Sequence, residues 1–186
     1  MNDANAANTV PLPSGRRKRV SLRSFQNELV ARLAARKNAP ELLSQLGFQA
    51  MKERFLCNLL EVEEILMPQA ITSVPLTRPW FLGLTNVRGN LYGVIDFSLF
   101  LGKQPTLIDD ETRMLLLGRA TGAGNIALLV QRIYGLRNTQ GFAATGQKLE
   151  DSSWNVQNWM DAEGNIWKEI RFTKLAQSLA FQYVGR

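Results

Sequence analysis

The chain has 186 residues, with 22 Lys and Arg against 16 Asp and Glu, which gives a formal charge of +6, and it contains no histidine. This length suits one domain or two small ones, and 45% apolar with 20% charged residues is typical of a soluble globular protein. The missing histidine excludes Ser-His-Asp and Cys-His catalytic groups, histidine-ligated metals and a phosphohistidine relay within this chain. The single cysteine, Cys57, excludes an internal disulfide and a cysteine-clustered zinc site, and it is typical of a reducing compartment.

The net charge lies entirely at the N-terminal end. Residues 1–37 hold eight bases and two acids, whereas residues 38–186 hold 14 of each. A domain that binds DNA or RNA usually carries its basic stripe on the folded surface, and here the body is neutral. A nucleic-acid-binding β-barrel protein that uses this basic arm is therefore kept only as the alternative hypothesis.

Residues 1–20 are predicted to be a disordered basic arm, because they show no apolar period and end in a run of four bases. Ser21 can cap a helix over about 21–38, whose Leu and Phe side chains share one face before Pro40 stops it. This helix either packs on the body or lies, with the arm, on an anionic membrane surface or a partner. Apolar runs are too short for a signal peptide or a bilayer span, which predicts a cytoplasmic protein.

From Leu46 onward the chain changes to short strands separated by turns. Turns are expected at residues 52–54, at the Gly89-Asn90 pair, which suits a two-residue turn with positive φ, and at residues 120–124 and 161–165. The strands that flank these turns are 46–50 and 55–60, 82–88 and 91–97, 113–119 and 125–136, and 156–160 and 166–172.

Helical signals in this part of the chain are few. One helical turn is expected at 98–101 after Asp96, and Thr173 can cap a closing helix over 173–184 with Phe172, Leu175, Ala176, Leu179 and Tyr183 on one side. Seven or more short strands with little helix favour two packed β-subdomains. Their expected spans are about 44–104 and 112–172, each the size of a five-stranded barrel.

Groups that could carry chemistry are sparse. Glu61, Glu63 and Glu64 form the densest acidic cluster, and a solvated face is favoured there over a metal or glycosidase site. The glycines at 118, 122 and 124 lack the Lys-Ser/Thr of a phosphate-binding loop, so a hairpin turn is favoured. Cys57 is predicted to be a small core residue and Asp96 a turn or cap residue. These observations predict that the chain is not an enzyme and uses no metal or cofactor.

The segment 79–90 is more informative. It places Asn86 and Arg88 beside Leu84 and Val87, which are expected to be exposed near a hairpin tip. An arginine with apolar neighbours is typical of a protein-interface hot spot, although a hairpin with one polar face accounts for the same residues equally well.

Val62-Glu63-Glu64-Ile65 has the pattern V-x-E-I, and residues 83–89 have the pattern G-x-x-N-x-R-G. In these two motifs the chain resembles the CheW-like coupling domain of bacterial chemosensory systems. Residues 91–97 followed by Leu101-Gly102 resemble its V-I-D-L and L-G strand and turn, and residues 126–136 resemble a later strand. The similar region spans about 44–184 and is most like the PilI-type members, which serve type IV pilus twitching motility. Gly93, Gln131 and the segment 137–153 depart from the family pattern.

The resemblance implies two packed SH3-like five-stranded β-barrels and a non-catalytic adaptor. Such proteins link the cytoplasmic tip of a methyl-accepting chemoreceptor to the regulatory domain of a CheA-like histidine kinase, so recruitment to membrane-associated receptor arrays is expected. An apolar groove between the barrels would suit an amphipathic receptor helix.

The resemblance also implies a set of protein-interaction residues. Among them, Glu64 and Arg88 match the family's paired surface charges, and Gly83 is expected to allow a close backbone approach rather than to contact a partner. The full set is Val62, Glu64, Ile65, Gly83, Asn86, Val87, Arg88, Ile133 and Leu136.

Overall fold

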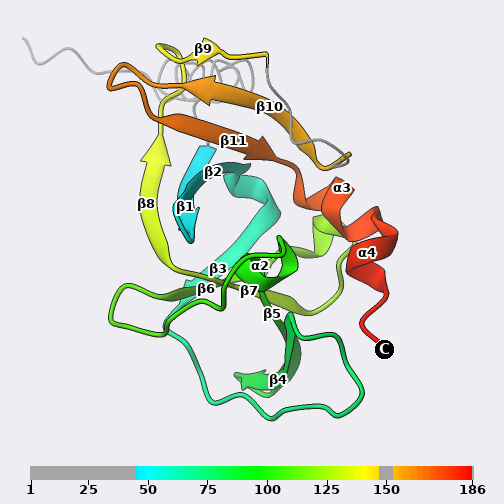
Figure 1. The fold of residues 1–186 in the computed structure, drawn as a ribbon. Coiled ribbons are helices and arrows are strands. Elements are labelled where there is room, and N and C mark those ends of the chain that lie inside the picture. Colours follow the sequence, from blue (N-terminus) through cyan, green and yellow to red (C-terminus); the bar gives the residue numbers. More distant parts are fainter. Residues whose placement is uncertain (1–44, 147–152, 186) are drawn as a thin grey trace, which may run out of the picture. The chain divides into compact units, whose positions relative to one another are not determined.

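The computed structural model describes residues 45–146 and 153–185, which form two curved β-sheets with a few short helices (Figure 1). The arm predicted for 1–20 and the helix predicted for 21–38 lie outside these residues. No helix in the described ranges is long and apolar enough to cross a membrane.

Sheet A has six strands in the order β8-β1-β2-β11-β10-β9. All neighbours in it are antiparallel except β11 and β2, which run parallel. Its strands are β1 (Gln45–Ala50), β2 (Glu53–Asn58), β8 (Arg132–Arg137), β9 (Ala143–Ala144), β10 (Asn155–Met160) and β11 (Ile166–Ile170).

Sheet B has five strands in the order β3-β6-β7-β5-β4, and here β5 and β7 form the parallel pair. Its strands are β3 (Val62–Leu66), β4 (Phe81–Val87), β5 (Asn90–Asp96), β6 (Arg113–Leu117) and β7 (Ile126–Val130). The four predicted strand pairs are all present as antiparallel neighbours, which confirms the mainly β fold.

The two sheets do not follow the two predicted halves of the chain. The stretch 44–104 supplies β1 and β2 to sheet A and β3 to β5 to sheet B, and the stretch 112–172 is divided in the same way. The chain leaves sheet A after β2 and returns to it at β8, so its N-terminal hairpin is completed by C-terminal strands.

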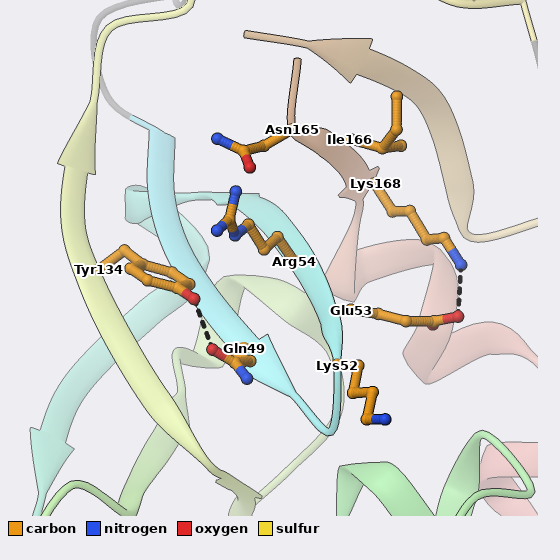
Figure 2. A pocket seen from close by; sticks show the side chains of 8 residues that line it. All are labelled: Gln49, Lys52, Glu53, Arg54, Tyr134, Asn165, Ile166 and Lys168. Atoms are coloured by element: carbon orange, nitrogen blue, oxygen red, sulfur yellow. Dashed lines mark hydrogen bonds and ion pairs between the residues drawn. The ribbon is translucent and has the colours of Figure 1, made fainter. Parts of the chain in front are cut away.

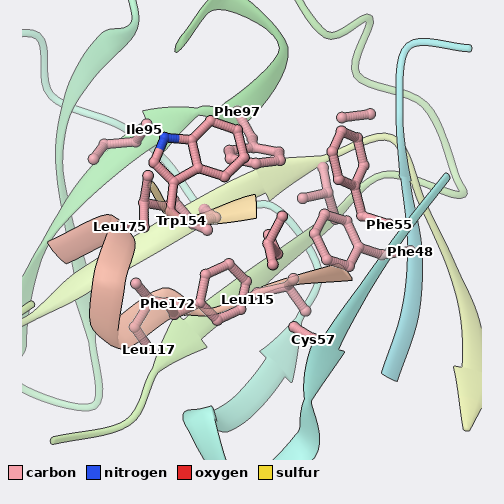
Figure 3. Close-up of a cluster of buried hydrophobic side chains, with 14 of the residues drawn as sticks. Phe48, Phe55, Cys57, Ile95, Phe97, Leu115, Leu117, Trp154, Phe172 and Leu175 are labelled. Carbon is pink, nitrogen blue, oxygen red and sulfur yellow. The ribbon is translucent and has the colours of Figure 1, made fainter. Parts of the chain in front are cut away.

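One apolar cluster joins the sheets and the short helices (Figure 3). Phe48 of β1 stacks on Phe55 of β2 with ring centroids 5.4 Å apart, and Phe97 and Phe55 form a T-shaped pair with centroids 5.3 Å apart. Strands β6 and β7 are buried on both faces: Leu115 and Leu128 enter this cluster, whereas their neighbours in the strands enter a second cluster inside sheet B. A strand buried on both faces needs a continuous apolar run, which is what these two strands have.

The single helical turn α2 (Phe97–Phe100) begins directly after Asp96, one residue earlier than predicted. Its cap is Asp96, whose Oδ1 accepts hydrogen bonds from the backbone N–H groups of Ser98 and Leu99. The other carboxylate oxygen accepts the N–H of Thr106 at 2.8 Å and so holds the loop that leads toward β6. Asp96 is therefore a buried cap, as predicted.

The predicted closing helix is formed as two short helices, α3 (Phe172–Gln177) and α4 (Leu179–Gln182). Ser178 lies between them with extended backbone, which ends the 3.6-residue period. As a result Leu179 and Tyr183 are exposed and Phe181 is buried in their place. The prediction that Leu179 and Tyr183 share the buried side is wrong.

Candidate functional site

The tip of the β4–β5 hairpin begins one residue earlier than the sequence predicts. Val87 pairs with Asn90, so the two turn residues are Arg88, with φ 52°, and Gly89, with φ 86°. The Oδ1 of Asn86 accepts the N–H of Gly89 at 2.8 Å and closes the turn. Two positive φ angles in succession are typical of a type I′ hairpin turn, and the second suits glycine. Arg88 is held in the left-handed region by the turn.

Arg88 reaches from this turn to Glu64 on β3. Its Nη1 donates to Oε2 at 3.0 Å and its Nη2 to Oε1 at 2.6 Å, so the contact is bidentate. Strands β3 and β4 are the two edge strands of sheet B, and Arg88 directly follows β4. The ion pair therefore links the two edges of that sheet. The Arg88 side chain remains 74% exposed. The predicted charge pair thus exists, with its guanidinium facing solvent.

An exposed face of the same hairpin lies beside this pair. Asn86 is paired directly opposite Leu91, and Leu84 lies two residues before Asn86, so the three side chains share one face of the two strands. Leu84 is exposed and Leu91 is 59% exposed. Ile65 on β3 is also exposed. The sequence analysis did not identify Leu91 as a candidate contact residue, although its position directly opposite Asn86 in the hairpin could have indicated it.

Three of the predicted residues face inward. Val87 is only 8% exposed and packs in the cluster inside sheet B, so the expectation that it is exposed is wrong, because it alternates with exposed Asn86. Val62 packs against the cluster that joins the sheets. At Gly83, with φ 135°, a Cβ atom would lie 2.1 Å from the carbonyl oxygen of Thr72, so glycine is required for the backbone approach predicted there.

Ile133 and Leu136 lie on β8 of sheet A, whereas the other seven predicted residues lie on β3, on β4 and in the β4–β5 turn of sheet B. Ile133 packs against the cluster that joins the sheets, and Leu136 is 63% exposed. The structure therefore does not place these two residues on the hairpin face.

The acidic cluster divides between surface and interior. Glu63 is exposed, but Glu61 ends a 3₁₀ turn (Leu59–Glu61) and is only 7% exposed. Its carboxylate accepts the N–H of Phe172 at 3.0 Å and both the N–H and the hydroxyl of Thr173. The prediction of a solvated face is wrong for Glu61, because a helix 111 residues away supplies it with donors.

A hollow of about 450 Å³ lies where the two sheets meet. It is bounded by the β1–β2 turn, by residues 104–107 and by Gln131, which links β7 to β8 and donates its N–H to the carbonyl of Gln49. Leu107 is exposed at its rim. The lining of this hollow comes from loops that the sequence analysis did not single out, and the groove for a receptor helix stays a prediction.

Burial raises the pKa of the Cys57 thiol well above its ordinary value, and the nearby Glu61 carboxylate adds to this effect, so the thiol stays protonated in the core as predicted. In residues 45–146 and 153–185 no three Cys, Asp or Glu side chains gather in a way that could hold a metal ion.

Comparison with known proteins finds a matching family and two curated relatives. The model of the CheW-like domain family matches residues 44–162. The chain is 28% identical over 110 residues to Protein PilI of Pseudomonas aeruginosa, an alignment that spans 59% of this chain and 61% of that protein. It is 32% identical over 77 residues to the chemotaxis protein CheW of Helicobacter pylori, which spans 41% of this chain and 47% of the relative. The alignments thus cover less than two thirds of either relative.

A solved structure shares the fold. The scaffolding protein TtCheW from Thermoanaerobacter tengcongensis superimposes with a TM-score of 0.56 at 17% identity, over 69% of this chain and 90% of that one. At this identity the likeness concerns the fold alone, and it confirms the predicted pair of packed SH3-like barrels.

Proposed function

The chain belongs to the CheW-like domain family, and from that membership we propose that it is a non-catalytic adaptor of a chemosensory system. Its proposed partners are the cytoplasmic tip of a methyl-accepting chemoreceptor and the regulatory domain of a CheA-like histidine kinase. The proposed place of action is the cytoplasm, at membrane-associated receptor arrays. The similarity to Protein PilI supports a system that controls type IV pilus twitching motility.

The observation that carries this proposal is the Glu64–Arg88 pair beside exposed Leu84 and Leu91. An exposed ion pair contributes only about 0.2–1 kcal/mol to stability, so it has little effect on folding. An arginine next to apolar side chains is, however, a frequent source of binding energy at interfaces. Glu64, Ile65, Asn86, Arg88 and Leu136 are proposed as contacts, and Val62, Gly83, Val87 and Ile133 as the residues that support them from within.

Reversal of either charge tests the proposal directly. Arg88→Glu places a carboxylate next to Glu64, and Glu64→Arg places two guanidinium groups together, so each variant should weaken binding to the kinase regulatory domain at least about tenfold. Binding is measured by calorimetry with the regulatory domain of a CheA-like kinase and with the cytoplasmic tip of a chemoreceptor, both taken from the same organism as this chain. The melting temperature should change little, because both side chains lie at the surface.

The ion pair between Arg132 and Glu111 provides a matched control. Both of its side chains are exposed, and it lies on β8 and the loop before β6, away from the hairpin. Arg132→Glu and Glu111→Arg change the net charge by the same amounts as the test variants and should leave binding unchanged. If the Arg88 and Glu64 reversals bind both partners as tightly as these controls do, the hairpin face is not the contact surface.

A test in cells separates the pathway from the contact surface. Deletion of the gene should abolish twitching and leave flagellar swimming intact, and the wild-type gene should restore twitching while Arg88→Glu should not. Loss of swimming with normal twitching would instead assign the chain to a flagellar system.

The nucleic-acid hypothesis stays a prediction that a salt titration can test. Binding through the eight bases of residues 1–37 should weaken steeply with salt, with a log–log slope of roughly −0.9 for each phosphate neutralised. Full-length protein with residues 16–19 changed to Gln should then lose most of its affinity for DNA and RNA, while kinase binding should be unaffected.

A further inference from the structure

Two arginines and two aromatic rings form a cluster on sheet A, whereas the hairpin face with Leu84, Asn86 and Leu91 belongs to sheet B. The guanidinium carbon of Arg54 lies 5.5 Å from the centre of the Tyr134 ring and 5.7 Å from that of Trp167. Arg137 lies at 5.5 and 5.3 Å from the same two rings. Gly47 on β1 makes room for this packing, since a Cβ there would lie 3.0 Å from the Trp167 ring.

Arg54 also lines a hollow of about 540 Å³ over β1, β2, β8 and β11. Figure 2 shows its guanidinium group directed toward the space between Tyr134 and Asn165. The other residues that line the hollow are Gln49, Lys52, Glu53, Ile166 and Lys168. This volume lies within the range of small-molecule sites, and the lining is mostly polar.

The charges of the hollow are unbalanced toward the positive. Its one carboxylate, Glu53, is already held by Lys168, whose Nζ lies 2.9 Å from Oε1, and Lys103 approaches the same oxygen at 4.0 Å. Within the described residues no carboxylate lies within ion-pair distance of Arg54, and Lys52 is exposed with no ion pair. Two cationic side chains therefore face the hollow without compensation.

The geometry points to a binding site for a phosphoryl oxyanion in this hollow, with Arg54 and Lys52 as its main contacts. A guanidinium that lies against aromatic rings keeps a fixed orientation while the N–H groups at its edge stay free, and this arrangement suits two oxygens of one phosphate. The ligand is a small phosphorylated solute or the phosphate headgroup of a lipid. A neutral apolar helix does not fit, because it would leave both cations without a partner.

Titration of full-length protein with sodium pyrophosphate, followed by calorimetry at low ionic strength, tests the site. Arg54→Gln should weaken binding by about tenfold or more, because one charge-assisted bidentate contact is lost. Arg54→Lys keeps the charge but loses the paired N–H geometry, so its affinity for pyrophosphate should lie between those of wild type and Arg54→Gln. Glu53→Gln should have the opposite effect and tighten binding, because it removes the carboxylate from the hollow.

Controls separate this site from the basic arm and from misfolding. Arg132→Gln removes the same charge from β8 outside the hollow, and the change of residues 16–19 to Gln removes the charge of the arm; both should bind pyrophosphate within about twofold of wild type. Melting curves check that each variant folds. If Arg54→Gln does not fold, exposed Lys52→Gln is used in its place and should weaken binding severalfold.

Sedimentation with vesicles distinguishes the two sources of phosphate. Binding to phosphatidylglycerol vesicles but not to phosphatidylcholine vesicles, lost in Arg54→Gln, assigns the site to a lipid headgroup, and pyrophosphate binding without vesicle binding assigns it to a solute. The inference is overturned if neither probe binds, if Arg54→Gln behaves as Arg132→Gln does, or if binding is lost only when the arm is changed.

Discussion

Glu61 and Glu64 lie three residues apart at the start of sheet B, and the structure places them in opposite surroundings. Glu61 is buried and accepts three hydrogen bonds at the beginning of α3, where Arg171 provides no side-chain cap of its own. Glu64 is partly exposed and forms a bidentate ion pair with the exposed guanidinium of Arg88. One carboxylate thus serves the interior and the other the surface.

The difference shows how one short acidic segment can serve both fold and recognition. Backbone N–H groups at a buried helix start have no water to replace a lost acceptor, so Glu61 fixes where the C-terminal helices attach. When the ion pair opens, water hydrates both Glu64 and Arg88. The two side chains can therefore exchange their mutual contact for contacts with another protein at small cost in free energy. The predictions below test this division.

Replacement of Glu61 should have the largest effect on stability. Glu61→Ala leaves two backbone N–H groups and a hydroxyl without their acceptor, and the free energy of unfolding should fall by about 2–4 kcal/mol. Glu61→Gln keeps one acceptor oxygen and should lose less. The measurement is urea unfolding of full-length protein followed by circular dichroism.

Exposed Glu63 provides the control for that experiment, because Glu63→Ala removes the same charge from the same segment and should stay within about 0.5 kcal/mol of wild type. Equal effects of Glu61→Ala and Glu63→Ala would show that the capping contacts do not stabilise the fold.

Asp161 extends the comparison to a carboxylate at a hairpin turn, with a smaller expected effect because it is partly exposed. Desolvation alone would raise its pKa, but hydrogen bonds from the indole N–H of Trp167 and from the side chain and backbone of Asn165 outweigh it and lower the pKa from 3.8 to about 2. The folded state therefore favours the ionised form, and this stabilisation is present above pH 3.8 and lost as the pH falls through about 2.

Unfolding midpoints measured between about pH 5 and pH 2 test this linkage. Asp161→Asn cannot ionise, so its stability should decline less over that interval than that of wild type. Parallel declines in the two proteins would mean that other carboxylates account for the acid sensitivity.

Much of the fold follows from local patterns in the sequence. The predicted strand 113–119 and the first part of the predicted strand 125–136 are present as the antiparallel pair β6 and β7, and the loop 161–165 joins β10 to β11 as predicted. The division into sheets could not be predicted in this way. It depends on the parallel pairings of β2 with β11 and of β5 with β7, which join segments far apart in the chain and leave no local signal.

The site shows the same limit at the level of single residues. The Glu64–Arg88 pair and the close approach at Gly83 follow from the family resemblance of the two motifs that contain these residues. The burial of Glu61 does not, because its donors come from α3, and the turn at Arg88 does not, because Gly89-Asn90 fits a two-residue turn equally well by composition. A contact distant in the sequence decides the first case, and the register of the hairpin, closed by the Asn86 side chain, decides the second.

The smallest expected effect separates the backbone of Arg88 from its side chain. Arg88→Ala and Arg88→Gly both remove the guanidinium and the ion pair, but only glycine adopts a φ of 52° without steric cost. Arg88→Gly should therefore be about 1 kcal/mol more stable than Arg88→Ala, as measured by urea unfolding. If Arg88 acts in recognition, both variants should lose partner binding equally despite this difference. Binding that instead follows stability, with Arg88→Gly close to wild type, would make the shape of the turn, and not the charge of Arg88, the feature that the partner reads.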